Sequence, residues 1–227
     1  IKDGARCSAA AAYLKPVLGI RANLHVESHA HATRVVVEDG RAVAVEYASG
    51  PGAPRKRIKA GREILLAAGA VQSPQILLLS GVGDPGALGA QGIEVNAASP
   101  DVGRNLQDHL DVALSYECPL PITAYSATKG LGRLALAANY VTRKKGAGRY
   151  NFLEAGAFVK TRPELAAPDI RLHTFAAVVM DHGRANIGRD GFTIAVCQLR
   201  PESRGEVRLA CADPFAPPVI DPNYLSA

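Results

Sequence analysis

The sequence predicts a chain in two parts, an α/β half followed by an α+β half whose sheet is antiparallel. In the first half an unbroken apolar run at residues 64–68 leads into a helical stretch, which is typical of a parallel strand covered on both faces. Beyond Asp108 the strand-like runs are longer and alternate between apolar and polar residues, which indicates antiparallel strands. With 227 residues, 48% of them hydrophobic, the chain is long enough for one large domain or two small ones.

A β-hairpin is predicted early in the first half. Asp39 and Gly40 form a dipeptide that supplies the positive φ angles of a type I′ turn, so residues 32–38 and 41–47 are expected to pair. The other expected elements before the apolar run are a helix end at residues 13–18, a strand that begins at residues 23–26 and a basic strand at residues 55–59.

A helix is predicted directly after the apolar run. Ser73 is placed to cap its first amides, Pro74 stands at the first helical position, where a missing N–H costs nothing, and Gly81 ends it. Residues 84–92 are then expected to form a short helix and residues 93–95 a short strand.

The second half contains one predicted helix and four predicted strands. Leu131, Leu134, Ala138 and Val141 recur at helical spacing, so residues 131–144 are expected to form a helix against one face of the sheet. The strands are predicted at residues 112–117, 152–159, 170–178 and 192–199.

Composition excludes several classes of protein. The net charge of +5 comes partly from the basic run at residues 55–59, which has no interleaved aromatic residues, so no nucleic-acid partner is expected. No apolar run reaches the roughly 18 residues that span a bilayer. We expect a cytoplasmic protein, with association at a membrane surface and a homo-oligomer left open. The cysteines form no CxxC pair and are expected to be reduced; they are Cys7, Cys118, Cys197 and Cys211.

Two motifs suggest a ligand, but their context argues against it. Residues 81–86 match the dinucleotide pattern G-x-G-x-x-G, yet they follow a helix instead of a strand, and Pro85 removes an amide that a phosphate would need. His25, His29 and His31 would share one face of an extended chain, which permits a metal site. Histidines are common on half-exposed strands, so no metal is predicted.

Two other groups resemble parts of catalytic centres. Asp108 and His109 could be read as an acid–base pair, but adjacent side chains rarely pair, so a structural role is favoured. Ser73 and Ser80 stand at element ends without the G-x-S-x-G pattern of a hydrolase. A hydrolase and a non-catalytic sheet domain that binds a partner remain as alternatives.

Three segments, in order, resemble signatures of the glucose-methanol-choline (GMC) oxidoreductases and in particular their choline dehydrogenase-like branch. They are residues 69–83 (GAVQSPQILLLSGVG), residues 102–109 (VGRNLQDH) and residues 200–225, which contain RPESRGEVRL and DPNYL.

The resemblance implies an FAD-dependent enzyme that oxidises a primary alcohol, choline-like or aliphatic, by hydride transfer to flavin. Its electron acceptor stays open. It also implies that the pyrophosphate-binding turn precedes Ile1 and that the catalytic histidine lies beyond Ala227. We therefore expect an internal piece of a larger flavoenzyme, which alone would neither hold FAD tightly nor turn over.

The resemblance also implies domain limits and cofactor residues. A partial, Rossmann-like FAD-binding domain is expected at residues 1–108, an antiparallel-sheet substrate domain at residues 109–199 and the start of a C-terminal region at residues 200–227. The implied FAD contacts are Ala32, through its main chain against the adenine, with Ala68, Gly69 and Asn105.

Three residues of the second half are candidates for the substrate pocket. Glu154 is a lone acid in an otherwise apolar strand, where burial of a carboxylate is costly without a partner or a purpose. A solvated position at a wet sheet edge explains it equally well. Tyr116 and His173 are the further candidates for contact with the small alcohol substrate.

Overall fold

The computed structural model describes residues 1–149, 153–180 and 188–227, and the chain divides into two compact units. Unit 1 consists of Ile1–His25 and His109–Pro201, and unit 2 consists of Val26–Asp108 and Glu202–Ala227. Each unit mixes helices with antiparallel strands, which is the fold class that the sequence predicts.

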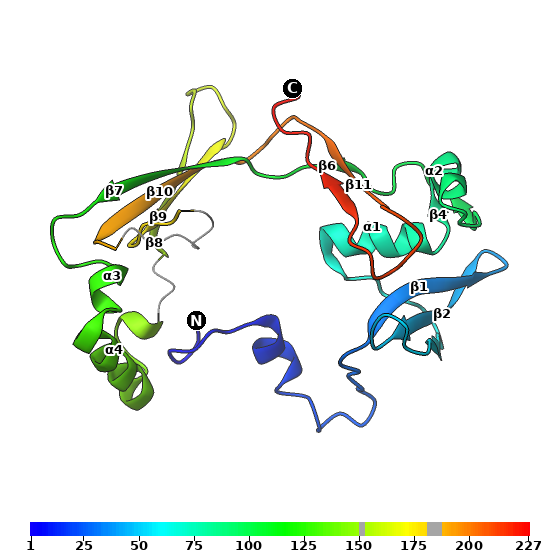
Figure 1. Cartoon of the computed structure of the whole chain (residues 1–227), viewed down its shortest axis with the longest axis horizontal. Coiled ribbons are helices and arrows are strands. Elements are labelled where there is room, and N and C mark those ends of the chain that lie inside the picture. Colours follow the sequence, from blue (N-terminus) through cyan, green and yellow to red (C-terminus); the bar gives the residue numbers. More distant parts are fainter. Residues whose placement is uncertain (150–152, 181–187) are drawn as a thin grey trace. The chain divides into compact units, whose positions relative to one another are not determined.

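Unit 2 begins with a three-stranded antiparallel sheet in the order β1-β2-β3 (Figure 1). Asp39 and Gly40 have φ angles of 49° and 72°, and the residues on either side of them pair, so the predicted two-residue turn is confirmed. The strands are β1 (His31–Glu38), β2 (Arg41–Ala48) and β3 (Lys56–Lys59).

Helix α1 (Gly69–Leu79) begins earlier than predicted. Its N-cap is Ala68 and not Ser73, and Pro74 lies inside it instead of at its first position. The chain turns at Gly69, whose φ of 87° is open to glycine without strain. The Ser73-Pro74 signal therefore identified the right helix but placed its start too late in the chain.

Three strands predicted for the first half are absent. Residues 64–68 are not a strand, and Leu65 is 81% exposed, because no described segment supplies the neighbour that a parallel strand needs. Residues 23–26 are also outside any strand. Residues 93–95 are not a strand either, although Ile93 packs against the core of unit 2. A helical turn does end in residues 13–18, as expected: it is the π-helical η1 (Ala10–Leu14), with its C-cap at Lys15 directly before Pro16.

The core of unit 2 joins segments from both ends of the unit. Leu78, Leu88 and Leu209 are buried together, and α1 lies against both β1 and β11. Helix α2 (Pro85–Ala90) begins as predicted, with the Asp84 carboxylate accepting the Ala87 amide at 2.8 Å. The remaining strands are the parallel pair β4 (Val82–Gly83) and β5 (Ala97–Ala98), and the antiparallel sheet of β12 (Val219–Asp221), β11 (Gly205–Arg208) and β6 (Arg104–Leu106).

Unit 1 contains the predicted antiparallel sheet, in the order β7-β10-β9-β8 (Figure 1). Because β10 inserts between β7 and β9, the order in space differs from the order in the chain. The strands are β7 (Asp111–Glu117), β8 (Leu153–Val159), β9 (Ile170–Phe175) and β10 (Gly191–Gln198).

The predicted helix of unit 1 is confirmed as α4 (Gly130–Arg143), which follows the short α3 (Ala124–Ala127) and precedes the 3-10 turn η2 (Ala147–Arg149). Its repeating apolar residues are not buried, however: Leu131 is 83% exposed and Leu134 is 67% exposed. Within the described ranges no helix is both long and apolar enough to cross a bilayer.

Candidate functional site

A cavity of about 230 Å³ lies between β1 and α1 in unit 2 and is called here the β1–α1 cavity. Pockets for drug-sized ligands have volumes of roughly 300–1,000 Å³, so this cavity fits one ring system of a larger ligand. Its lining residues, mostly apolar, are Ala30, His31, Ala32, Ala68, Gln72, Gln75, Ile76, Leu79 and Pro214.

Two of the four predicted cofactor residues line this cavity, and a third follows one of them in the chain. Ala32 and Ala68 line it, and Gly69 follows Ala68 as the first residue of α1. Ala68 supplies no side-chain cap for the first N–H groups of α1. These N–H groups and the positive end of the helix dipole therefore lie near the cavity. Asn105 lies instead in β6, exposed and with a φ of 60°, and is not among the lining residues. Its cofactor role stays a prediction.

The strand beside the cavity can offer backbone hydrogen bonds. β1 is an edge strand that pairs only with β2 in its sheet, and the Val35 amide on this strand donates to Ser80 Oγ at 2.8 Å. An apolar slot beside an edge strand suits a flat heterocycle, which needs packing on its faces and a few polar contacts at its rim. The residues present therefore fit the adenine end of FAD.

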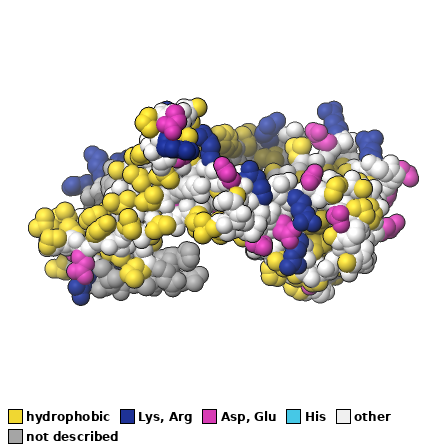
Figure 2. All heavy atoms as spheres, turned by 90° about the horizontal axis from the view of Figure 1, so that it is seen from above, with side chains coloured by type: hydrophobic (Ala, Val, Ile, Leu, Met, Phe, Trp, Pro, Cys, Tyr) yellow, Lys and Arg dark blue, Asp and Glu magenta, His cyan; other side chains and the backbone are white. Residues whose placement is uncertain are grey.

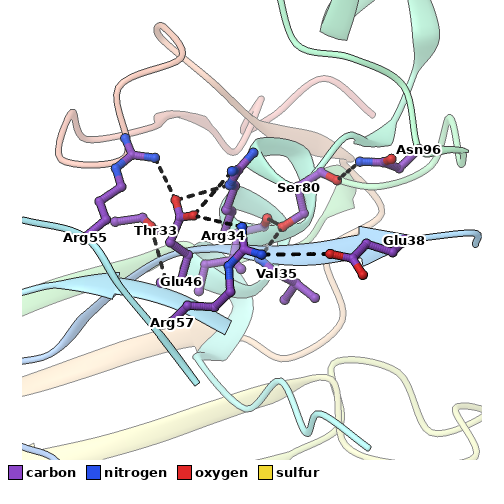
Figure 3. A network of polar contacts seen from close by, with 10 residues as sticks. Thr33, Arg34, Val35, Glu38, Glu46, Arg55, Arg57, Ser80 and Asn96 are labelled. Atoms are coloured by element: carbon purple, nitrogen blue, oxygen red, sulfur yellow. Dashed lines mark hydrogen bonds and ion pairs between the residues drawn. The ribbon is translucent and has the colours of Figure 1, made fainter. Parts of the chain in front are cut away.

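A polar network holds the hairpin beside α1 in place (Figure 3). The Glu46 carboxylate is 10% exposed and accepts hydrogen bonds from Arg34 Nε at 3.2 Å and Arg55 at 2.9 Å. Ser80, at the C-cap of α1, donates from Oγ to the Ile76 carbonyl and accepts from Val35. The network thus fixes β1 against the end of α1.

Arginine neighbours control the ionisation of Glu46. Burial raises the pKa of its carboxyl group, but the hydrogen bonds and positive charges of Arg34 and Arg55 outweigh burial, so the pKa is lowered from its ordinary value. Glu46 is therefore ionised at neutral pH and acts as a structural anion.

The glycine-rich stretch at residues 81–86 has a packing role. A Cβ at Gly81 would collide with the Glu94 carbonyl, and a Cβ at Gly83 would come within 2.6 Å of Leu78. Two further cavities of unit 2, of about 300 and 410 Å³, include none of the predicted site residues. These glycines allow close contact between segments.

The substrate candidates of unit 1 lie on different faces of its sheet. Tyr116 pairs with Phe192, and His173 pairs with Ala195, three residues further along β10. Because side chains alternate along a strand, Tyr116 and His173 point to opposite sides. The register shift between β8 and β9 falls at Glu154, whose side chain lies outside the described part of the chain.

Tyr116 belongs to an apolar face that is partly open. Tyr116 is 51% exposed, and its ring stacks on Phe192 with centroids 5.4 Å apart. On the opposite face the β10 residues are covered: Thr193 and Ala195 are 0% and 5% exposed, whereas their β7 partners are exposed. The open face consists of Val112, Leu114, Tyr116, Phe192, Ile194 and Val196. Larger apolar residues alternate with smaller residues within residues 192–198, and this alternation is the signal that could have identified the β10 residues of the open face.

The serine and Asp-His groups have structural contacts. Ser80 is 3% exposed and its hydroxyl is occupied by the two bonds described above, so it is not a free nucleophile. Asp108 accepts from the Tyr224 hydroxyl at 2.6 Å, whereas His109 Nε2 donates to the Leu199 carbonyl at 3.2 Å. The two neighbours therefore bind different segments.

The three histidines considered for a metal do not share a strand face. His25 and His29 precede β1, and only His31 belongs to it. Within the described ranges, no group of three or more His, Cys, Asp or Glu residues could hold a metal ion.

Comparison with known proteins gives a consistent result. A family model described as GMC oxidoreductase matches residues 1–111. Mitochondrial choline dehydrogenase of Homo sapiens is 40% identical over 226 residues, which are 100% of this chain and 38% of the relative. Alcohol dehydrogenase (acceptor) of Pseudomonas putida is 39% identical over 229 residues, 99% of this chain and 41% of the relative.

Solved structures with the same fold include two oxidases. Pyridoxine 4-oxidase from Mesorbium loti superposes with a TM-score of 0.78 at 27% identity, over 100% of this chain and 40% of its own. Formate oxidase superposes with a TM-score of 0.80 at 24% identity, over 87% of this chain and 39% of its own. The chain thus spans about two fifths of the length of the relatives it matches.

Proposed function

Because this chain belongs to the GMC oxidoreductase family, we propose that it is part of an FAD-dependent enzyme that oxidises a small primary alcohol to the aldehyde. The observation that carries this proposal is that Ala32 and Ala68 line one cavity, with Gly69 next to Ala68 at the start of α1, together with the 40% identity to choline dehydrogenase along the whole chain.

Unit 2 would hold the adenosine half of FAD. The β1–α1 cavity would receive the adenine, with the main chain of Ala32 at its rim and the free amides at the start of α1 toward the sugar and phosphate. FAD when bound would accept the hydride that leaves the alcohol carbon. The residues described here would position that cofactor, and no proton-transfer step is assigned to them.

Unit 1 would contribute to the substrate side. Its open face presents Tyr116 stacked on Phe192, and aromatic faces attract cations such as a quaternary ammonium group. A choline-like alcohol would match this chemistry, since one end of it is cationic and the other carries the hydroxyl. An aliphatic alcohol would use only the apolar part of the face.

Anaerobic reduction of the bound flavin tests the proposed function. The full-length natural protein that contains these residues would be purified and mixed with choline, with a short aliphatic alcohol and with an ester. We expect a yellow protein whose flavin absorption bleaches with at least one alcohol and not with the ester. A protein without flavin, or a flavin that no alcohol reduces, would contradict the proposal.

Substitution of Glu154 tests the substrate side separately. Glu154→Gln removes the charge of the lone acid of β8, so we expect a raised KM or a lowered kcat for polar or cationic alcohols and little change for aliphatic ones. Steady-state kinetics with both classes of alcohol provide the comparison. Equal kinetics of variant and parent for every alcohol would remove Glu154 from the site.

A further inference from the structure

One wall of the β1–α1 cavity comes from a distant part of the chain. Pro214 lines the cavity, although it is 183 positions away from its partner His31. The segment around it is a compact turn, in which Asp213 accepts the Phe215 amide on its carboxylate at 3.0 Å and the Ala216 amide on its carbonyl at 3.1 Å. This turn, residues 213–216, is called here the cavity wall.

Three contacts fasten the cavity wall to the two elements that form the rest of the cavity. His31 Nε2 donates to the Pro214 carbonyl at 2.9 Å, and the His31 ring stacks on Phe215 with centroids 4.7 Å apart and planes 29° from parallel. Gln75 Nε2 donates to the Ala216 carbonyl at 2.9 Å. His31 stands on β1, and Gln75 stands on α1, where it is 8% exposed.

We propose that His31 and Gln75 are positioning residues that hold the cavity wall at the distance at which it packs against an adenine ring. This inference rests on the proposed function, since it assigns the ligand of the cavity as an adenine nucleotide. A flat ring gains dispersion energy on both faces only if both walls are in contact, and a gap of 0.5–1 Å forfeits about a quarter to a half of that attraction. His31 and Gln75 also line the cavity, but their Nε2 atoms are bound to the wall, so release of the wall weakens binding through lost packing.

Paired substitutions separate the contacts. His31→Phe keeps a ring stacked on Phe215 but loses the hydrogen bond to the Pro214 carbonyl. His31→Gln keeps a hydrogen-bond donor but loses the ring. Gln75→Leu removes the donor to the Ala216 carbonyl. We expect each variant of the full-length apoprotein to bind ADP and FAD on the order of tenfold more weakly than the parent does. The factor should be the same for both ligands. FMN, which lacks the adenosine half, should bind the parent and the variants equally.

The controls distinguish positioning from loss of fold. His25→Ala changes an exposed histidine outside the cavity and should leave the ADP affinity unchanged. Phe215→Leu disturbs the same stack from the opposite side and should weaken ADP binding as His31→Gln does. His31→Gln and Phe215→Leu remove the same ring contact. The variant that carries both substitutions should therefore lose less ADP affinity than the product of the two single losses.

Isothermal titration of ADP, FAD and FMN into each apoprotein decides the matter. Weaker ADP and FAD binding with unchanged FMN binding and an unchanged unfolding temperature supports the positioning role. Parent-like ADP affinity in the variants at His31, Gln75 and Phe215 overturns it while the proposed function stands. Equal losses for ADP and FMN together with a lowered unfolding temperature show a purely structural contact and also overturn it. A parent protein that binds neither FAD nor ADP overturns both proposals.

Discussion

The two units differ in where they keep their apolar side chains. Unit 2 buries Leu78, Leu88 and Leu209 in a common core, whereas the buried hydrophobic residues of unit 1 among the described ranges are Ala195 and Cys197. In the view of Figure 2, hydrophobic side chains gather over unit 1, and charged side chains are more frequent over unit 2. Unit 2 therefore has a core of its own, while unit 1 presents apolar surface that a ligand or another surface can cover.

This difference is consistent with the separate tasks proposed for the two units. A narrow cavity keeps its shape only if its walls are fixed, and unit 2 fixes them with its core and with the network around Glu46. Unit 1 instead presents an open apolar face on β7 and β10, and the proposed function would place the alcohol there.

A matched pair of leucine substitutions should show the largest contrast. Leu88 is 1% exposed in unit 2, so Leu88→Ala should cost about 3 kcal/mol of unfolding free energy through the lost burial and the cavity left behind. Leu134 is 67% exposed in unit 1, so Leu134→Ala should change the unfolding free energy by less than about 0.5 kcal/mol. Denaturant titration of both variants measures the contrast, and equal losses would show that α4 is buried in solution.

Removal of the buried anion of unit 2 should have the next largest effect. Glu46→Gln weakens charge-assisted hydrogen bonds to Arg34 and Arg55, which should cost about 2 kcal/mol. The control is Glu38→Gln, because Glu38 is 61% exposed and lies 3.8 Å from Arg57, where an ion pair contributes little. If Glu38→Gln lowered the unfolding free energy as much as Glu46→Gln does, the effect would come from the change in overall charge and not from the network.

The same residue predicts a pH dependence. The pKa of Glu46 is lowered in the folded protein, so its stabilising contribution is complete above the ordinary value of 4.5 and is lost as the pH falls through the lower folded value. The parent should therefore be more stable than Glu46→Gln at pH 7, and the difference should shrink below about pH 4.5. Unfolding curves of the two proteins at several pH values test this, and a constant difference down to acid pH would contradict it.

A smaller, local effect is expected in unit 1. Asp190 accepts the Thr123 hydroxyl at 2.6 Å, the Thr123 amide at 3.1 Å and the Ser126 hydroxyl, and so caps α3 from outside the helix. Asp190→Asn should loosen α3 and speed tryptic cleavage after Lys129 several-fold, with the core of unit 2 unaffected. Asp111→Asn, at an exposed strand start, is the matched control. Unchanged cleavage in Asp190→Asn would show that the cap is dispensable.

What the sequence predicted correctly was decided by local chemistry. The hairpin turn depends on Asp39 and Gly40 alone, and the strands of unit 1 follow from alternation within each strand. Helix α2 likewise begins where the sequence predicted it, and the structure shows the local cap of Asp84 followed by Pro85. These features need no knowledge of distant contacts.

What the sequence missed depends on partners elsewhere. Residues 64–68 have the composition of a buried strand, but composition does not supply a neighbouring strand. The start of α1 was misplaced because the Ser73-Pro74 cap signal competed with the turn at Gly69. Pro214 could not be placed at the cavity from local pattern, because its contact with His31 joins the first strand of unit 2 to the last part of the chain.

Hydrogen exchange of the full-length protein with and without FAD tests the central claim most directly. If the adenosine half of FAD occupies the β1–α1 cavity, FAD should slow amide exchange at residues 31–33 and 68–71, and ADP alone should slow exchange at the same amides. The exposed amides of α4 should exchange at the same rate in both states. Protection by bound FAD that leaves residues 31–33 and 68–71 unchanged would contradict the account.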